Sequence, residues 1–241
     1  MSGHQKRLTA PNAWSIAKKA NTFITKTAPG PHTKDAMPVA VWLRDHMGLA
    51  RNMKEIKKIL SSRAVIVNGK PARDPKLGIG VFDIISIPAM QKHYRILLDK
   101  RGNFVSIEIT EDAAKTRLCK IRNKTEVKGG KVQLNLRYGV NIIADHSYRP
   151  RDSVVLSLEE SNHYAIVDHF PFSEGNVAMV IGGRHSGKVG RIAEIIDTAG
   201  SIPNKVILDE LETGTRFDTI DTYVFMVGRE EPAVKEWGIE A

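Results

Sequence analysis

The sequence has little of what disulfides, metal sites and membrane spans need. Cys119 is the only cysteine among 241 residues, which excludes an internal disulfide and a cysteine-based zinc site. The longest uninterrupted apolar stretch, residues 37–43, is far shorter than a membrane-spanning helix and contains Pro38. The first residues also lack the apolar core of a signal peptide. We therefore expect a cytoplasmic protein in a reducing compartment, with no membrane attachment.

Motifs for catalysis are also scarce. The eight histidines include no helical His-x-x-x-His pair beside a glutamate, and no Gly-x-Ser-x-Gly elbow occurs. Residues 182–188 fit the G-x-x-x-x-G-K pattern of a phosphate-binding loop, but Val189 stands where a hydroxyl must bind Mg²⁺. The following residues have a strand pattern, whereas such a loop requires a helix N-terminus. We predict a glycine-rich β-turn there, and expect no catalytic residue, metal, cofactor or small-molecule substrate.

Positive charge is in excess and unevenly distributed. The chain has 36 Lys and Arg against 27 Asp and Glu, a net charge of +9, and this indicates a polyanionic partner. Residues 1–34 contain six basic and no acidic residues, whereas residues 206–241 contain three basic and nine acidic ones. The length suits one large domain or two to three small ones, and 41% hydrophobic residues are enough for folded cores.

Residues 1–36 have the composition of a basic arm. They mix cations with small residues and lack sustained helical or strand periodicity. Such a segment is either a solvated tail or a segment that folds against RNA phosphates when it binds. We expect the arm to be disordered in the free protein, because its cations repel one another and it has few apolar residues. Trp14 provides an anchor, either stacked on a base or packed against the protein's own body.

Two helices and a hairpin are predicted between residues 37 and 93. The second helix, over about 52–62, has Asn52 as its N-cap and an apolar stripe at helical spacing, and the first covers about 38–47. Asn68-Gly69 after a β-branched run predicts a hairpin turn, because both positions need positive φ. The cations that this module brings within reach of one another are Arg51, Lys54, Lys57, Lys58, Arg63, Lys70 and Arg73.

Strand patterns dominate the remainder of the chain. In the region 94–173 we predict a short helix over 110–117 and strands at 95–99, 104–109, 120–127, 131–137, 154–158 and 164–168. From residue 174, five short strands predict a small barrel, at 177–181, 189–196, 205–209, 216–220 and 223–227. The fold class is therefore α+β and multidomain.

Several segments resemble known RNA-binding elements. The basic helix around Glu55–Leu60, followed by Val65–Lys70, resembles the alpha-L RNA-binding fold of bacterial small-subunit ribosomal protein four, tyrosyl-tRNA synthetases and pseudouridine synthases. Residues 175–201 resemble a KOW motif, a β-loop-β element of translation and transcription proteins. Together with further matching segments in the same order along residues 3–230, they resemble the archaeal and eukaryotic e-type family of small-subunit ribosomal protein four. Those segments are Arg7–Trp14, Gly30–His32, Arg44-Asp45, Phe82–Ile87, Leu118–Ile121 and Gly182-Gly183.

The resemblance implies three small domains after the arm and no catalysis. The domains are an alpha-L RNA-binding domain over 37–93, a β-rich central domain over 94–173, and an SH3-like barrel with the KOW motif and an acidic tail over 174–241. It also implies a structural constituent of the small ribosomal subunit that binds small-subunit ribosomal RNA beside neighbouring ribosomal proteins. The chain's length favours an archaeal member, and the acidic stretch around Glu230, Glu231 and Glu236 departs from the expected basic pattern.

The predicted RNA contacts are cations and polar side chains in all four segments, because phosphates supply most of the affinity for RNA. They are Lys6, Arg7, Lys18, Lys19, Arg51, Lys54, Lys57, Lys58, Arg63, Asn68, Lys70, Arg73, Lys120, Arg122, Lys124, Lys128, Arg184, His185 and Lys188. The glycine-rich loop is expected to bind RNA and not ATP.

Two other functional classes stay open at this point. An RNA-modifying enzyme, such as a pseudouridine synthase, would use the alpha-L module for targeting, but residues 95–241 divide into two small β units with little room for its large catalytic domain. A transcription elongation factor built around the KOW motif would leave the alpha-L module unexplained.

Overall fold

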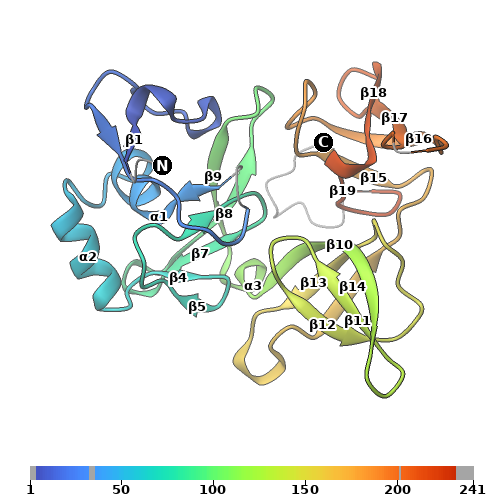
Figure 1. Ribbon diagram of the computed structural model, residues 1–241, viewed down its shortest axis with the longest axis horizontal. Helices are drawn as coiled ribbons and strands as arrows, with labels where there is room; N and C mark the ends of the chain where they lie inside the picture. The colour runs from blue at the N-terminus through green and yellow to red at the C-terminus, as the bar shows by residue number, and fades with distance from the viewer. Residues whose placement is uncertain (1–3, 33–35, 201, 232–241) are drawn as a thin grey trace. The chain divides into compact units, whose positions relative to one another are not determined.

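The computed structural model describes residues 4–32, 36–200 and 202–231, and it is rich in strands with few helices (Figure 1). The described chain divides into two compact units: residues 4–32, 36–97 and 103–114 form the first, and residues 98–102, 115–200 and 202–231 form the second. No helix of the described residues is long and apolar enough to cross a membrane. Glu236 of the acidic tail lies outside the described residues.

The first unit is built around a five-stranded sheet in the order β5-β4-β7-β8-β9. These strands are β4 (Ile66–Val67), β5 (Lys70–Pro71), β7 (Ile84–Ile87), β8 (Lys92–Leu98) and β9 (Phe104–Ile109). The first unit also contains two two-stranded antiparallel sheets. In one, β1 (Gln5–Lys6) pairs with β2 (Phe23–Ile24), and in the other, β3 (Met37–Pro38) pairs with β6 (Gly78–Ile79). Strands β8 and β9 extend this sheet, and the first unit includes residues 103–114.

Both helices predicted for this unit are present. Helix α1 (Val39–Val41) continues as a π-helix over Trp42–His46, and helix α2 covers Met53–Ser61. Asn52 caps α2, because its side-chain oxygen accepts a hydrogen bond of 3.0 Å from the backbone N–H of Glu55. The helix predicted over 110–117 is shorter, α3 (Glu111–Ala114), because the next strand already begins at Thr116.

The basic arm is part of the first unit's core. Trp14 and Arg7 are each 2% exposed. Arg7 donates from Nη2 to Asp45 Oδ1 at 2.7 Å and from Nε to the carbonyl of Ala17 at 2.6 Å. His46 Nε2 lies 2.6 Å from the Trp14 carbonyl oxygen. Residues 4–32 therefore pack on the rest of the first unit, which contradicts the expectation of an arm without a core. Of the two anchors considered for Trp14, the structure shows the one in which it packs against the protein itself.

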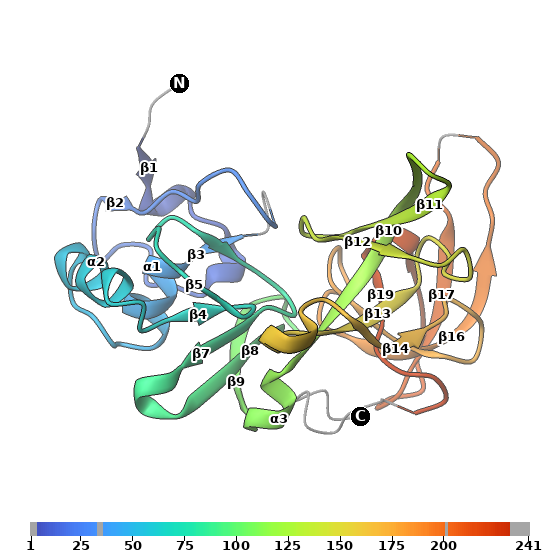
Figure 2. The same cartoon turned by 90° about the horizontal axis from the view of Figure 1, so that it is seen from below.

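The second unit contains two five-stranded sheets (Figure 2). The central sheet has the order β12-β11-β10-β13-β14, with β10 (Thr116–Val127), β11 (Lys131–Leu136), β12 (Asn141–Ala144), β13 (Ser153–Ser157) and β14 (Ile166–Phe170). The C-terminal sheet has the order β18-β17-β16-β15-β19, with β15 (Val177–Val180), β16 (Val189–Ile196), β17 (Lys205–Glu210), β18 (Arg216–Ile220) and β19 (Val224–Met226). The five predicted C-terminal strands are thus present in one sheet.

Apolar side chains from alternate strand positions form the core of the central sheet. This core is made of Cys119, Ile121, Val132, Leu134, Leu136, Val140, Val154 and Leu156. Cys119 is 0% exposed, so it is a buried strand residue and not an accessible thiol.

Candidate RNA-binding surface

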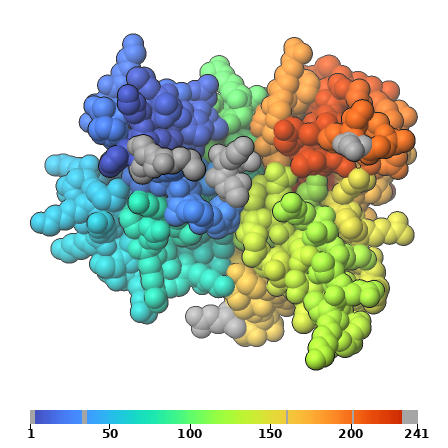
Figure 3. All heavy atoms as spheres, in the orientation of Figure 1, coloured from blue at the N-terminus to red at the C-terminus, as the bar shows by residue number. Residues whose placement is uncertain are grey.

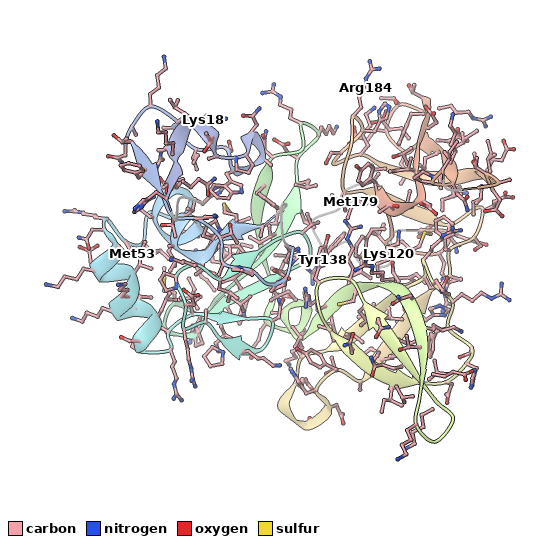
Figure 4. The ribbon with its side chains drawn as sticks, viewed as in Figure 1. Lys18, Met53, Lys120, Tyr138, Met179 and Arg184 are labelled. Atoms are coloured by element: carbon pink, nitrogen blue, oxygen red, sulfur yellow. The ribbon has the colours of Figure 1, made fainter. Side chains whose placement is uncertain are left out.

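Seven predicted contact cations lie on α2 and the β4–β5 hairpin or within two residues of them. Residues 51–73 contain seven basic residues and one acidic residue, Glu55. All seven cations are exposed, and we call them the basic corner: Arg51, Lys54, Lys57, Lys58, Arg63, Lys70 and Arg73. Figure 4 shows long side chains projecting outward from α2 near the labelled Met53, and in Figure 3 the same cyan segment borders the visible face.

Glu55, the one acidic residue among the cations of the basic corner, directs its carboxylate to the N-terminus of α2. Its carboxylate accepts hydrogen bonds from the backbone N–H of Arg51 at 2.7 Å and from Asn52 Nδ2 at 2.9 Å. This is a capping box, in which the acid serves the helix N-terminus. Helix α2 buries only Ile56 and Leu60, so its lysines occupy the faces directed to water.

Asn68 shapes the hairpin turn through its side chain. Asn68 and Gly69 have φ of 50° and 78°, as the Asn-Gly turn requires. The Asn68 side chain donates to Asp83 Oδ1 and accepts from the backbone N–H of Ile84, both at 2.9 Å. Its amide is therefore engaged within the protein and positions Lys70, although the sequence predicted it as an RNA contact.

The structure contradicts Arg7 and Lys120 as RNA contacts, because their charged ends lie inside the protein. Lys120 is 5% exposed, and its Nζ donates to the carbonyls of Asp221 and Val224 at 2.7 Å each. Burial lowers the pKa of Lys120 to about 7, and the nearby charges of Arg137 and Arg151 add to this, while Asp221 opposes it. Figure 4 shows Lys120 within the second unit.

Other predicted contacts on the central sheet and the arm differ in accessibility. Lys124 is half-buried, and its Nζ donates to the carbonyls of His146, at 2.9 Å, and Tyr148. Lys18 is half-buried and donates to the Asn12 side chain. Of the predicted contacts in the arm and the central sheet, Lys6, Lys19, Arg122 and Lys128 are exposed. Exposed lysines outside the predicted set include Lys26 in the arm, Lys131 on β11, and Lys76.

The glycine-rich loop joins β15 to β16, and the strand after Lys188 replaces the helix that a nucleotide-binding loop needs. Arg184 projects from the loop in Figure 4. Lys188 Nζ lies 2.9 Å from Glu210 Oε2, and hydrogen bonds from Thr213 and Lys188 hold the pKa of Glu210 below its ordinary value. Of the predicted contacts in this loop, Arg184 is exposed, whereas His185 is half-buried with its ring 4.8 Å from that of Phe217.

Tertiary packing adds two cations to this loop that the sequence did not reveal. A Cβ on Gly187, which has φ of 88°, would lie 1.8 Å from the carbonyl oxygen of Asp99, so the loop packs directly on residues 98–102. Lys100 and Arg101 of that segment are exposed, and Lys100 pairs with Glu212. The only sequence signal was a Lys-Arg pair between two strands. Among the described residues, no group of three or more His, Cys, Asp or Glu side chains is placed to hold a metal ion.

Comparisons with known proteins give one consistent family. The model of ribosomal family S4e matches residues 90–163, that of the RS4NT domain matches residues 1–35, and that of the KOW motif matches residues 174–209. A protein named small ribosomal subunit protein eS4 from Methanospirillum hungatei is 58% identical over 240 residues, which cover 100% of both chains. The protein of that name from Archaeoglobus fulgidus is 40% identical over 228 residues. The matched region covers 95% of this chain and 94% of that protein.

A solved structure agrees with these matches. The crystal structure of the 30S ribosomal protein S4e from Thermoplasma acidophilum superposes with a TM-score of 0.67 at 28% sequence identity. The match covers 81% of this chain and 96% of that chain.

Proposed function

The chain belongs to the ribosomal S4e family, and from this premise we propose that it holds ribosomal RNA through the basic corner of α2 and the β4–β5 hairpin. The protein is a structural component of the small ribosomal subunit in the cytoplasm, and it is not an enzyme. The alternative of an RNA-modifying enzyme is therefore set aside. Eight relatives that bear the name eS4 are archaeal, which agrees with the short chain.

We also assign the two RNA-binding folds to particular segments. The order of helix, basic helix, hairpin and strand from α1 to β7 supports an alpha-L RNA-binding fold. Five short strands in one sheet, with the KOW match over residues 174–209, support an SH3-like barrel in the C-terminal part. Small-subunit ribosomal RNA and the neighbouring proteins of the subunit are the expected partners.

The observation that carries this proposal is the exposure of all seven cations of the basic corner, with their one acidic neighbour used as a helix cap. Seven ammonium and guanidinium groups on adjoining elements suit the phosphates of a folded RNA. Each phosphate neutralised by a cation releases condensed counterions, so affinity falls steeply as salt increases. Since the cations sit on a helix and a rigid turn, the spacing of the phosphates, and thus the RNA's shape, determines recognition.

The test is the salt dependence of binding to transcribed small-subunit ribosomal RNA. Replacing Lys54, Lys57 and Lys58 together by Gln should lower the log–log salt slope by about two to three, and affinity at 0.1 M salt by roughly 100-fold or more. The matched control is the triple replacement of Lys92, Lys205 and Arg229 by Gln. Lys205 and Arg229 are exposed and Lys92 is half-buried, and each lies within 4 Å of a carboxylate: Lys92 at 3.1 Å, Lys205 at 3.9 Å and Arg229 at 3.4 Å.

The control removes the same charge from cations that already have an acidic partner, and should leave the salt slope nearly unchanged. An equal loss of slope in both triple variants would mean that net charge alone governs binding. An unchanged slope in a folded α2 variant would refute the proposal.

A further inference from the structure

Phe23 is an aromatic side chain that the arm exposes on an ordered strand. It is 57% exposed, whereas the adjoining Ile24 is 7% exposed, so β2 turns one side chain inward and presents the other to water. Strand β2 pairs with β1, which places Phe23 directly opposite Lys6 (Figure 2). The ring of His4 lies beside that of Phe23, with 5.8 Å between the centroids and planes tilted by 52°.

The two aromatic residues of the arm that the structure describes have opposite environments. Trp14 is 2% exposed and lies in the first unit's core, so its indole is not available to a ligand. Phe23 is held by the β1–β2 ladder but has most of its ring in water. A side chain on a fixed strand loses little further freedom when a partner covers it, which favours binding.

The charge around Phe23 indicates the chemistry of that partner. Residues 1–34 contain six basic residues and no acidic one. Lys6, Lys19 and Lys26 are exposed in the same segment. An exposed aromatic side chain opposite a lysine, in a segment whose charged residues are all basic, suits single-stranded RNA, whose bases stack on rings while phosphates meet ammonium groups. Protein interfaces are instead depleted in lysine, which disfavours an apolar protein partner here.

We propose that Phe23, with His4 beside it, is a stacking platform for an unpaired base of ribosomal RNA, and that Lys6 contacts a phosphate next to that base. The proposal rests on the protein's function in binding ribosomal RNA but concerns a different kind of contact. The basic corner recognises phosphates, whereas Phe23 recognises the face of a base that has left its helix.

Stacking has a binding signature that separates it from charge contacts. Base–aromatic stacking is worth about 1–3 kcal/mol, so Phe23→Ala should weaken binding to small-subunit ribosomal RNA by about 5- to 150-fold. The salt slope should not change, because stacking releases no counterions. Lys6→Gln should instead lower the slope by about one. Phe23→Trp should retain the affinity, while Phe23→Leu, which keeps apolar volume without a ring, should not.

The matched control is Leu8→Ala, since Leu8 is an apolar arm residue that is 62% exposed and has no ring. The affinity of the Leu8→Ala variant for ribosomal RNA should stay within about twofold of the wild type, because only an aromatic ring provides the stacking contribution. A loss in Leu8→Ala as large as that in Phe23→Ala, or full affinity in Phe23→Leu, would indicate an apolar docking surface and overturn the proposal.

Photocrosslinking in assembled subunits identifies the partner class. With p-benzoyl-phenylalanine in place of Phe23, we expect a crosslink to ribosomal RNA. A crosslink to a ribosomal protein alone would overturn the proposal. If the α2 variant loses salt slope while Phe23→Ala keeps full affinity, the stacking platform is refuted and the basic corner stands; the reverse result refutes the basic corner and retains the platform.

Discussion

Residues 51–73 and 115–137 have similar charge in sequence but differ in structure. The first stretch contains seven basic residues and one acidic residue, and the second contains eight and one. Every cation of the first is exposed, whereas in the second Arg117 and Lys120 are buried and Lys124 is bonded to backbone carbonyls. The density of charge along a sequence is therefore a poor guide to the charge that a partner meets.

The difference follows from the elements that carry the cations. Helix α2 contacts the core with one stripe, so most of its circumference faces water. Strand β10 has residues Arg117–Ile121 all buried and an exposed second half. At its buried end Lys120 pairs in register with Ser153, and the hydroxyl of Ser153 accepts a hydrogen bond from the backbone N–H of Met226 in β19. Both faces of the strand are covered there, so its cations cannot reach water.

The largest expected effect on stability comes from a buried cation of the arm. Arg7→Met should lower the free energy of unfolding of the first unit by about 3 kcal/mol, because it removes a buried guanidinium together with its hydrogen bonds to Asp45 and to the carbonyl of Ala17. The salt slope of RNA binding should stay unchanged. Urea unfolding followed by tryptophan fluorescence measures the stability, since Trp14 and Trp42 lie in this unit. Lys57→Gln is the matched control, with a stability change within about 0.5 kcal/mol and a slope reduced by about one.

If Arg7→Met lowered the salt slope of RNA binding while the arm stayed folded, a buried cation would be a phosphate contact. The distinction between exposed and buried cations would then fail.

Lys120 should make stability depend on pH. Its pKa is about 7 in the folded protein, below the ordinary lysine value of 10.5, so between these values the unfolded state binds more protons. Stability should therefore rise with pH across this window, by up to about 1.4 kcal/mol per pH unit. Lys120→Met should lose this contribution. It should also be less stable by about 2 kcal/mol at pH 9, because the carbonyls of Asp221 and Val224 lose their donor.

The measurement is urea unfolding by circular dichroism at several pH values, with Lys131→Met, which removes an exposed lysine from β11, as control. Identical pH profiles for the wild type and Lys120→Met would contradict the assignment of Lys120 as a buried amine.

The smallest effect should separate two cations that are two residues apart on β10. Lys124→Gln should lower stability by less than about 1 kcal/mol, since its hydrogen bonds are partly exposed, and should leave the salt slope unchanged. Arg122→Gln should lower the slope by about one without a change in stability, because Arg122 is exposed at a register shift of the strand. A wild-type slope in Arg122→Gln would show that this exposed cation of the sheet is not an RNA contact, and a lowered slope in Lys124→Gln would show that its hydrogen bonds do not withdraw it from RNA.

The features predicted correctly from the sequence are those that local interactions decide. Helix α2 with its Asn52 cap, the Asn68-Gly69 turn and strand β16 after Lys188 each depend on residues within one turn or one strand. Strand β7 begins only at Ile84, although the apolar run starts at Val81, because Phe82 has a φ of 65° and interrupts the extended conformation. Strand β12 was missed, since its short segment becomes a strand only by pairing with β11.

The sequence by itself determined the family, the excess of positive charge and the amphipathic helix that exposes its lysines. Composition, motif order and helical periodicity are properties of the chain that need no distant contact. Only the tertiary structure decided which cations remain in water and which aromatic side chain of the arm is exposed to solvent. Lys120 is covered by carbonyls more than one hundred positions away along the chain, and Trp14 rather than Phe23 entered the core. Burial is a property of the folded surface, so residues of one chemical type in one sequence context take different roles when remote segments close over some of them.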